Sequence, residues 1–91
     1  MTEKYKLKNY MEEIVLKNLE EQLAKRSDLP KDERFKLDVY AYSLNQVKPH
    51  YVVTDKGHIY TKLKEMEMQF NADVTRVVYQ SIEFIKERLR K

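Results

Sequence analysis

Hydrophobic side chains recur every three or four residues along most of this chain, which is the spacing of one face of an α-helix. The first such series follows Asn9, a residue type that caps helix N-termini, and it ends before Pro30. Proline disfavours a helical residue directly ahead of it, so we expect this helix to stop near the segment KRSDLP. The series consists of Met11, Ile14, Val15, Leu19 and Leu23.

Two further hydrophobic series predict two more helical regions. A short helix is expected to restart around Asp32, with Leu37, Val39, Ala41 and Leu44 as its hydrophobic positions. The longest series runs from Ile59 to Leu89. Its phase continues across Asn71, which favours one long helix, although Asn71 could instead cap a separate one. The pattern therefore predicts a single domain over residues 1–91, all-α, with three or four helices and a long C-terminal helix.

The length of that last helix bears on oligomeric state. About thirty residues of helix extend ~45 Å, which exceeds the diameter of a globule of this chain length. Two shorter helices are not expected to cover its whole hydrophobic stripe. We therefore expect a homodimer, with a second copy packing on the long helix.

Composition excludes several classes of protein. The chain has no cysteine, which excludes disulfides and thiolate metal sites, and no hydrophobic run approaches the ~18 residues of a membrane span. Its net charge of +3 comes from 18 basic and 15 acidic side chains that interleave along the sequence. Interleaved charges are typical of solvated helices, so nucleic acid is an unlikely partner, even through the basic C-terminal KERLRK. We expect a soluble cytoplasmic protein that makes no contact with a membrane.

Catalytic and metal sites have little support in the sequence. No nucleophile and base stand in a recognisable arrangement, and no glycine-rich phosphate loop is present. His50 and His58 flank Asp55, but zinc usually requires three or four converging ligands. We therefore predict that the protein is not an enzyme, holds no metal and needs no cofactor.

The unusual residues gather between Lys36 and Lys62. Asp38, Tyr42 and Asn45 share one helical face, Pro49 then ends the helix, and an extended HYVVT and a DKG turn follow. A carboxylate can accept hydrogen bonds from a guanine edge, tyrosine rings stack on purines, and cations neutralise phosphate. A structural interpretation is also open, with Asp38 and Asn45 as helix caps and the tyrosines in the core. Spacing alone favours that second interpretation.

At these residues the sequence resembles the ComFB family of late competence development proteins. The resemblance covers Asn9 to Ile85, and its matching positions are Asp38-Val39, Ala41, Leu44-Asn45, Pro49, Tyr51-Val52, Gly57, Tyr60, Lys62, Gln69 and Asp73. It implies a helical homodimer that acts in signalling as a receptor for a cyclic dinucleotide, chiefly cyclic di-GMP and in some members cyclic di-AMP. A downstream regulatory protein would receive the signal. The alternative is a protein-interaction module in competence or motility regulation that binds no ligand.

The resemblance and the chemistry together suggest the ligand-binding residues. Asp38 and Asn45 would read a guanine edge, Tyr51 and Tyr42 would stack, and the phosphates would meet Lys36, Thr54, Lys62 and Arg76. The sequence departs from the family at one point. Many members carry a zinc-binding cysteine cluster before the second helix, whereas the corresponding positions here are Pro30, Asp32 and Phe35. No metal is carried over, and Phe35 is expected to stabilise this region by packing into the core.

Overall fold

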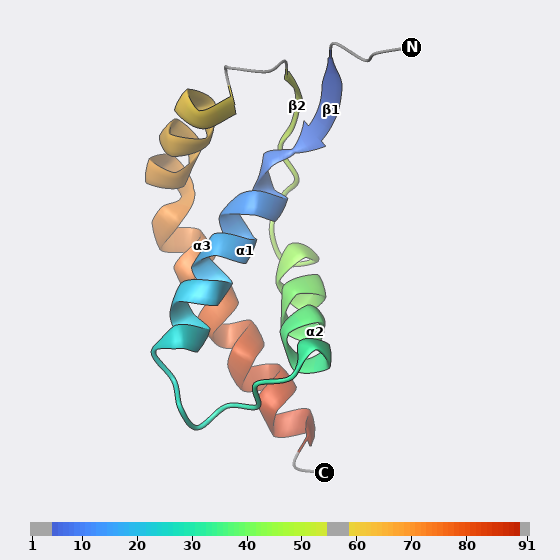
Figure 1. The fold of residues 1–91 in the computed structure, drawn as a ribbon, viewed down its shortest axis with the longest axis vertical. Helices are drawn as coiled ribbons and strands as arrows, with labels where there is room; N and C mark the ends of the chain where they lie inside the picture. The colour runs from blue at the N-terminus through green and yellow to red at the C-terminus, as the bar shows by residue number, and fades with distance from the viewer. Residues whose placement is uncertain (1–4, 55–58, 90–91) are drawn as a thin grey trace.

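Three helices and a two-stranded antiparallel sheet make up the protein (Figure 1). The computed structural model describes residues 5–54 and 59–89, except for the side chains of residues 54 and 59–63. In chain order the elements are β1 (Lys6–Asn9), α1 (Tyr10–Ala24), α2 (Glu33–Leu44), β2 (Tyr51–Thr54) and α3 (Ile59–Leu89).

The long helix α3 is the axis of the domain. Its 31 residues correspond to ~46 Å of helix, close to the 48 Å of the longest dimension of the molecule. Helices α1 and α2 both pack against it, and the ribbon of β1 and β2 lies at one end (Figure 1). The helix continues through Asn71, so the expectation of one long helix is confirmed.

Helix boundaries follow the capping residues that the sequence offers. Asn9 is the N-cap of α1, and its side-chain oxygen accepts a hydrogen bond from the Met11 amide at 3.2 Å. Asp32 is the N-cap of α2 and accepts from the Phe35 amide at 2.8 Å. Side-chain oxygens at these positions satisfy amides that have no partner within the helix. Both predicted helix starts are confirmed.

The protein is mostly helical, as predicted, and it has in addition a small sheet in which β1 and β2 pair in antiparallel register. Leu7 lies opposite Val53, and Asn9 lies opposite Tyr51. The extended conformation of HYVVT was predicted because Pro49 ends the preceding helix. Its partner strand was not predicted, because Lys6–Asn9 is short and its pairing residues lie far along the chain. The fold is mostly helical, with this small sheet added.

The core lies where the three helices meet. It contains Tyr10, Met11, Ile14, Val15 and Leu19 of α1, Phe35 and Val39 of α2, Met66, Val74, Val78 and Ile82 of α3, and Leu29 from the α1–α2 loop. Phe35 is buried in this cluster, as expected. The predicted hydrophobic positions of α2 are wrong in part, because Leu37 is 50% exposed and Ser43 is buried instead. One face of α2 meets both other helices, and Phe35, Val39 and Ser43 recur on that face at every fourth position.

The hydrophobic stripe of α3 is largely covered within a single chain from Met66 to Ile82, whereas Leu89 at the end of the helix is 59% exposed. Met66, Val74, Val77, Val78 and Ile82 are all buried by contacts inside the protein. The two shorter helices therefore reach further along α3 than helix lengths alone suggested. The geometric reason for expecting a second copy to pack on this stripe does not hold for this part of the helix.

Ion pairs tie the loop between α1 and α2 to the C-terminal half of α3. The Arg26 guanidinium donates to Asp28 at 2.9 Å and to Glu83 at 2.8 Å, and the Lys86 ammonium lies 3.2 Å from Asp28. Hydrogen bonds from Arg26 hold the pKa of the Asp28 carboxyl well below its ordinary value, and Lys86 lowers it further. Leu29 adds a buried hydrophobic anchor from the same loop. These contacts fix the loop to α3 and to the core.

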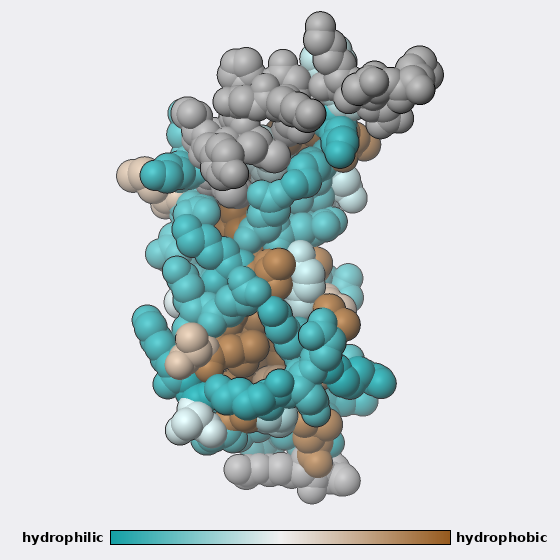
Figure 2. Space-filling view, viewed as in Figure 1, coloured by the Kyte–Doolittle hydropathy of each residue, from teal (hydrophilic) through white to brown (hydrophobic). Residues whose placement is uncertain are grey.

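The surface is mainly polar. Figure 2 shows hydrophilic side chains over most of the viewed face, with hydrophobic ones in breaks between them. No helix among the described residues combines the length and the hydrophobicity that crossing a membrane requires.

Candidate ligand-binding site

A groove runs along the contact between the C-terminal end of α2 and the middle of α3. It consists of two adjoining hollows of about 250 and 290 Å³. Gln46, Arg76 and Val77 line both hollows and so connect them. A single hollow falls short of the ~300–1,000 Å³ of ordinary ligand pockets, whereas the two together lie within that range.

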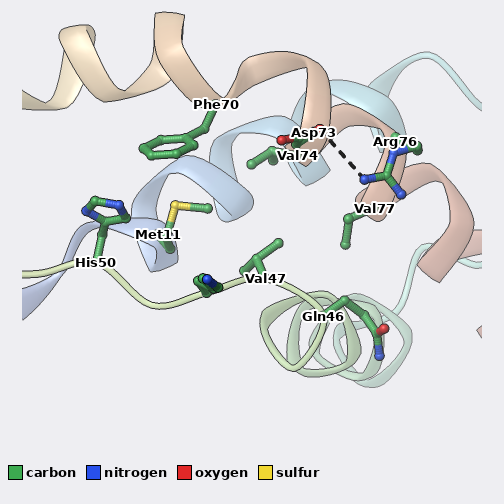
Figure 3. Close-up of a pocket in the computed structure, with 10 residues that line it drawn as sticks. Met11, Gln46, Val47, His50, Phe70, Asp73, Val74, Arg76 and Val77 are labelled. Carbon is green, nitrogen blue, oxygen red and sulfur yellow. Dashed lines mark ion pairs between the residues drawn. The ribbon is translucent and has the colours of Figure 1, made fainter.

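Each hollow of the groove has a pair of aromatic rings. In the first hollow the His50 and Phe70 rings lie with centroids 4.9 Å apart and planes tilted by 52° (Figure 3). In the second, Tyr42 and Phe84 are stacked, with centroids 4.5 Å apart and planes 11° from parallel. Ring pairs of this kind offer flat hydrophobic faces, on which a purine can stack.

Positive charge lies between and beside the ring pairs. Arg76 lines both hollows, Lys48 lines the first, and the Arg88 guanidinium carbon lies 5.6 Å from the centre of the Phe84 ring. Arg76 is paired with Asp73 one turn earlier on α3, at 3.7 Å (Figure 3). Both side chains of that pair are exposed, and exposed pairs of this kind contribute little stability. The guanidinium can therefore exchange Asp73 for the phosphate of a ligand at small cost.

The structure brings only some of the predicted residues into this groove. Tyr42 and Arg76 line it directly. Asn45 is the C-cap of α2 and immediately precedes Gln46 in the groove wall. Asp38 lies one turn before Tyr42 on the same helical face, and its carboxylate pairs with Arg34 at 3.2 Å. Asp38 and Asn45, which were predicted to bind a guanine edge, thus lie next to the groove on its α2 side. Asn45 also caps α2, which is the structural role that the sequence left open for it.

The remaining predicted residues lie elsewhere or outside the described side chains. Lys36 points toward α1, where it pairs with Glu20 at 2.9 Å. Tyr51 lines neither hollow and is 61% exposed. It follows His50 directly, and successive side chains of an extended segment point to opposite sides. The side chains of Thr54 and Lys62 lie outside the described residues.

Sequence reasoning missed several residues of the groove. Phe70, Val77 and Phe84 are seven residues apart on α3 and therefore share one face. Phe70 and Val77 were assigned to the hydrophobic series of the last helix, and Phe84 was not considered. His50 was interpreted as a loop histidine. Its place in the groove follows from the sheet, because its amide donates to the Asn9 side chain at 2.8 Å and its carbonyl accepts from the Tyr10 amide at 2.9 Å.

The groove offers binding chemistry in the form of cations, amides and ring faces. Gln46 and Gln80 add carboxamides that can pair with a base edge. Within the described part of the chain, no three histidine, aspartate or glutamate side chains converge in a way that could hold a metal ion. The arrangement can recognise an anionic molecule that carries aromatic rings.

Comparison with known proteins identifies the family. The family model described as late competence development protein ComFB matches residues 8–89. Among solved structures, the late competence protein ComFB from Bacillus subtilis superimposes with a TM-score of 0.70 and 29% sequence identity, covering 90% of each chain. A search of curated proteins gives no match. The family description names a role in competence development and no catalytic activity. Because the match covers nearly the whole chain, this protein belongs to the ComFB family of late competence development proteins.

Proposed function

We propose that this protein is a non-enzymatic receptor for a cyclic dinucleotide, cyclic di-GMP before cyclic di-AMP, and that the ligand binds in the groove between α2 and α3. The observation that carries the proposal is the combination of exposed cations with aromatic ring faces in two hollows that share Gln46, Arg76 and Val77. A cyclic dinucleotide has two phosphates and two purines, and each part finds a matching group there.

Individual roles follow from the positions of the side chains. Arg76, which borders both hollows, meets phosphate, and the stacked pair of Tyr42 and Phe84 provides a face for one purine. Asp38 and Asn45 lie beside that pair on α2, where a carboxylate and a carboxamide can accept and donate to a guanine edge. The bound state would then be passed, in the cytoplasm, to a downstream regulatory protein.

Isothermal titration calorimetry of the purified protein with cyclic di-GMP, cyclic di-AMP and GTP tests the proposal. We expect saturable binding of one cyclic dinucleotide at about −7 kcal/mol or better. Arg76→Gln should weaken binding roughly 10- to 100-fold, because it removes one charge-assisted hydrogen bond, which contributes ~1.5–3 kcal/mol. Lys17→Gln is the matched control, because it also removes one cation from an exposed ion pair but lies against Glu67, outside the groove.

Asp38→Ala tests the proposed reading of the base. The variant should abolish cyclic di-GMP binding and leave the helical content unchanged, because the Asp38–Arg34 pair is exposed and contributes little to folding. If Asp38→Ala instead melts the protein, the residue is structural and its proposed role is wrong.

The second candidate function is a protein-interaction module in competence or motility regulation, with no nucleotide ligand. The exposure of Leu37 on the outer face of α2 favours it, because a hydrophobic side chain there can contact a partner. The calorimetric titration separates the two functions, since a folded protein that is silent toward all three nucleotides supports the interaction module.

A further inference from the structure

A titratable ring, that of His50, lies at one end of the groove. It lines the first hollow and lies against Phe70, with the two ring centroids 4.9 Å apart (Figure 3). The residue is exposed, so its side chain is open to a ligand in the hollow. Histidine is the side-chain type whose charge ordinarily changes between pH 5 and 8, and both ring nitrogens of an imidazolium are hydrogen-bond donors.

Backbone hydrogen bonds hold His50 at this end of the groove. Its amide donates to the Asn9 side chain at 2.8 Å, and its carbonyl accepts from the Tyr10 amide at 2.9 Å. Asn9 is also the N-cap of α1, so the position of His50 is tied to the start of that helix. Both bonds use backbone atoms of His50, and they therefore hold the residue in place whether or not its ring is charged.

The charged side chains that line the first hollow oppose a further cation in the free protein. Lys48, from the segment between α2 and β2, and Arg76 of α3 line it together with His50. Asp73 is the one carboxylate among the described lining residues, and it is paired with Arg76 at 3.7 Å. The wall thus keeps a net positive charge, and like charges disfavour the protonated form of a histidine.

The described residues of α1 and β1 add no further charge to this hollow. Met11 is the residue of α1 that lines it. The first turn of α1 carries Glu12 and Glu13, but neither is a lining residue, and Glu13 pairs with Lys8 of β1. A bound anion would therefore change the balance of charge at His50.

We propose that His50 becomes a third cation of the first hollow, because its ring takes up a proton from the solvent as a phosphate of the ligand binds there. This inference rests on the proposed nucleotide function, since each phosphate of a cyclic dinucleotide carries a negative charge. That charge favours the imidazolium, which can donate a hydrogen bond to a phosphate oxygen. Because proton and ligand favour each other's binding, the affinity for the ligand should rise as the pH falls from 8 to 6.

Calorimetric titration at pH 6, 7 and 8, in buffers of different ionisation enthalpy, tests the inference. The ligand is cyclic di-GMP, or cyclic di-AMP if only that nucleotide binds. The observed enthalpy varies with the buffer in proportion to the number of protons taken up, and the phosphodiesters of the ligand do not titrate in this range. We expect proton uptake near pH 7 and roughly 3- to 10-fold tighter binding at pH 6 than at pH 8, the range for one exposed charge-assisted contact.

Three variants identify the group that takes up the proton. His50→Gln keeps a hydrogen-bonding side chain without the charge, and it should lose both the proton uptake and the tighter binding at pH 6. His50→Lys carries a fixed charge at the same place, and it should bind as tightly at pH 8 as at pH 6. His58→Gln is the matched control, because His58 is the other of the two histidines in the sequence, and it should behave as the wild type does. Circular dichroism checks that each variant is folded.

The outcomes separate this inference from the proposed function. Binding without proton uptake, and with the same affinity at pH 6 and pH 8, overturns the inference and leaves the function standing. Uptake that persists in a folded His50→Gln, or that disappears in His58→Gln, does the same. A folded protein that binds neither dinucleotide at any of the three pH values overturns the function and the inference with it. Should His50→Gln fail to fold, His50→Lys decides, because an affinity that still depends on pH in that variant also overturns the inference.

Discussion

Replacement of Phe35 by alanine should destabilise the protein more than any other single change near the α1–α2 loop. Phe35 is 2% exposed in the core cluster, at the point where α2 begins. Truncation of a buried phenylalanine to alanine costs ~3–5 kcal/mol through lost burial and the cavity left behind. The hydrogen bond from the Phe35 amide to the Asp32 side chain stays possible in the variant, so the loss measures packing and not capping.

That cost is large against the whole stability of the domain. A chain of 91 residues is expected to unfold with ~5–14 kcal/mol. Since ~1 kcal/mol shifts the melting temperature of a domain of this size by ~4–8 °C, Phe35→Ala should lower it by at least ~12 °C. Thermal denaturation followed by circular dichroism measures the melting temperature, and urea denaturation measures the free energy of unfolding.

Leu37→Ala is the control for the same experiment. Leu37 lies on the same helix and is 50% exposed. Its replacement by alanine should therefore cost about half of the ~1.5–3 kcal/mol that burying a whole leucine side chain contributes. The better helix propensity of alanine partly offsets this cost. If the two variants melt within a few degrees of each other, Phe35 does not anchor the loop and our account of how this chain stabilises the region without cysteines is wrong.

Two further predictions concern the same end of the domain. Because its bonds with Arg26 lower the pKa of Asp28 in the folded state, Asp28 stabilises the protein above the ordinary value of 3.8, and this stabilisation is lost as the pH falls. Asp28→Asn should therefore be less stable than wild type near neutral pH, and urea denaturation should show the difference shrinking below pH 3.8. Treatment with EDTA should leave the melting temperature unchanged, because the described residues contain no metal-binding group and the sequence has no cysteine. A lowered melting temperature after chelation would contradict this.

Much of the fold could be predicted from local patterns. The three- to four-residue spacing of hydrophobic side chains, with the capping residues Asn9 and Asp32, predicted where α1 and α2 begin. The same spacing continues across Asn71, which predicted one long α3. These features depend on residues within a turn or two of each other. The sheet was missed because β1 is defined by its pairing with β2, and nothing within Lys6–Asn9 itself specifies that contact.

The candidate site was predicted less completely, for a related reason. Tyr42 and Arg76 were identified by residue type, but which neighbours join them depends on how α2 docks on α3. Strand pairing fixes the direction of the residues after Pro49. It places His50 in the groove and leaves Tyr51 exposed on β2. Lys36 pairs with Glu20 of another helix, a contact that spacing within α2 does not indicate. Sequence spacing shows which side chains share a face of one helix. Which side chains line a groove also depends on how two helices dock against each other.

Nuclear magnetic resonance mapping of cyclic di-GMP onto the isotope-labelled protein tests the central claim most directly. If the ligand binds between α2 and α3, the largest amide and side-chain shifts should fall on Tyr42, Gln46, Arg76 and Phe84, with His50 and Phe70 shifting at the other end of the groove. Shifts confined to β1 and β2 or to the α1–α2 loop, or no shifts at all, would contradict the assignment of this groove as the nucleotide site.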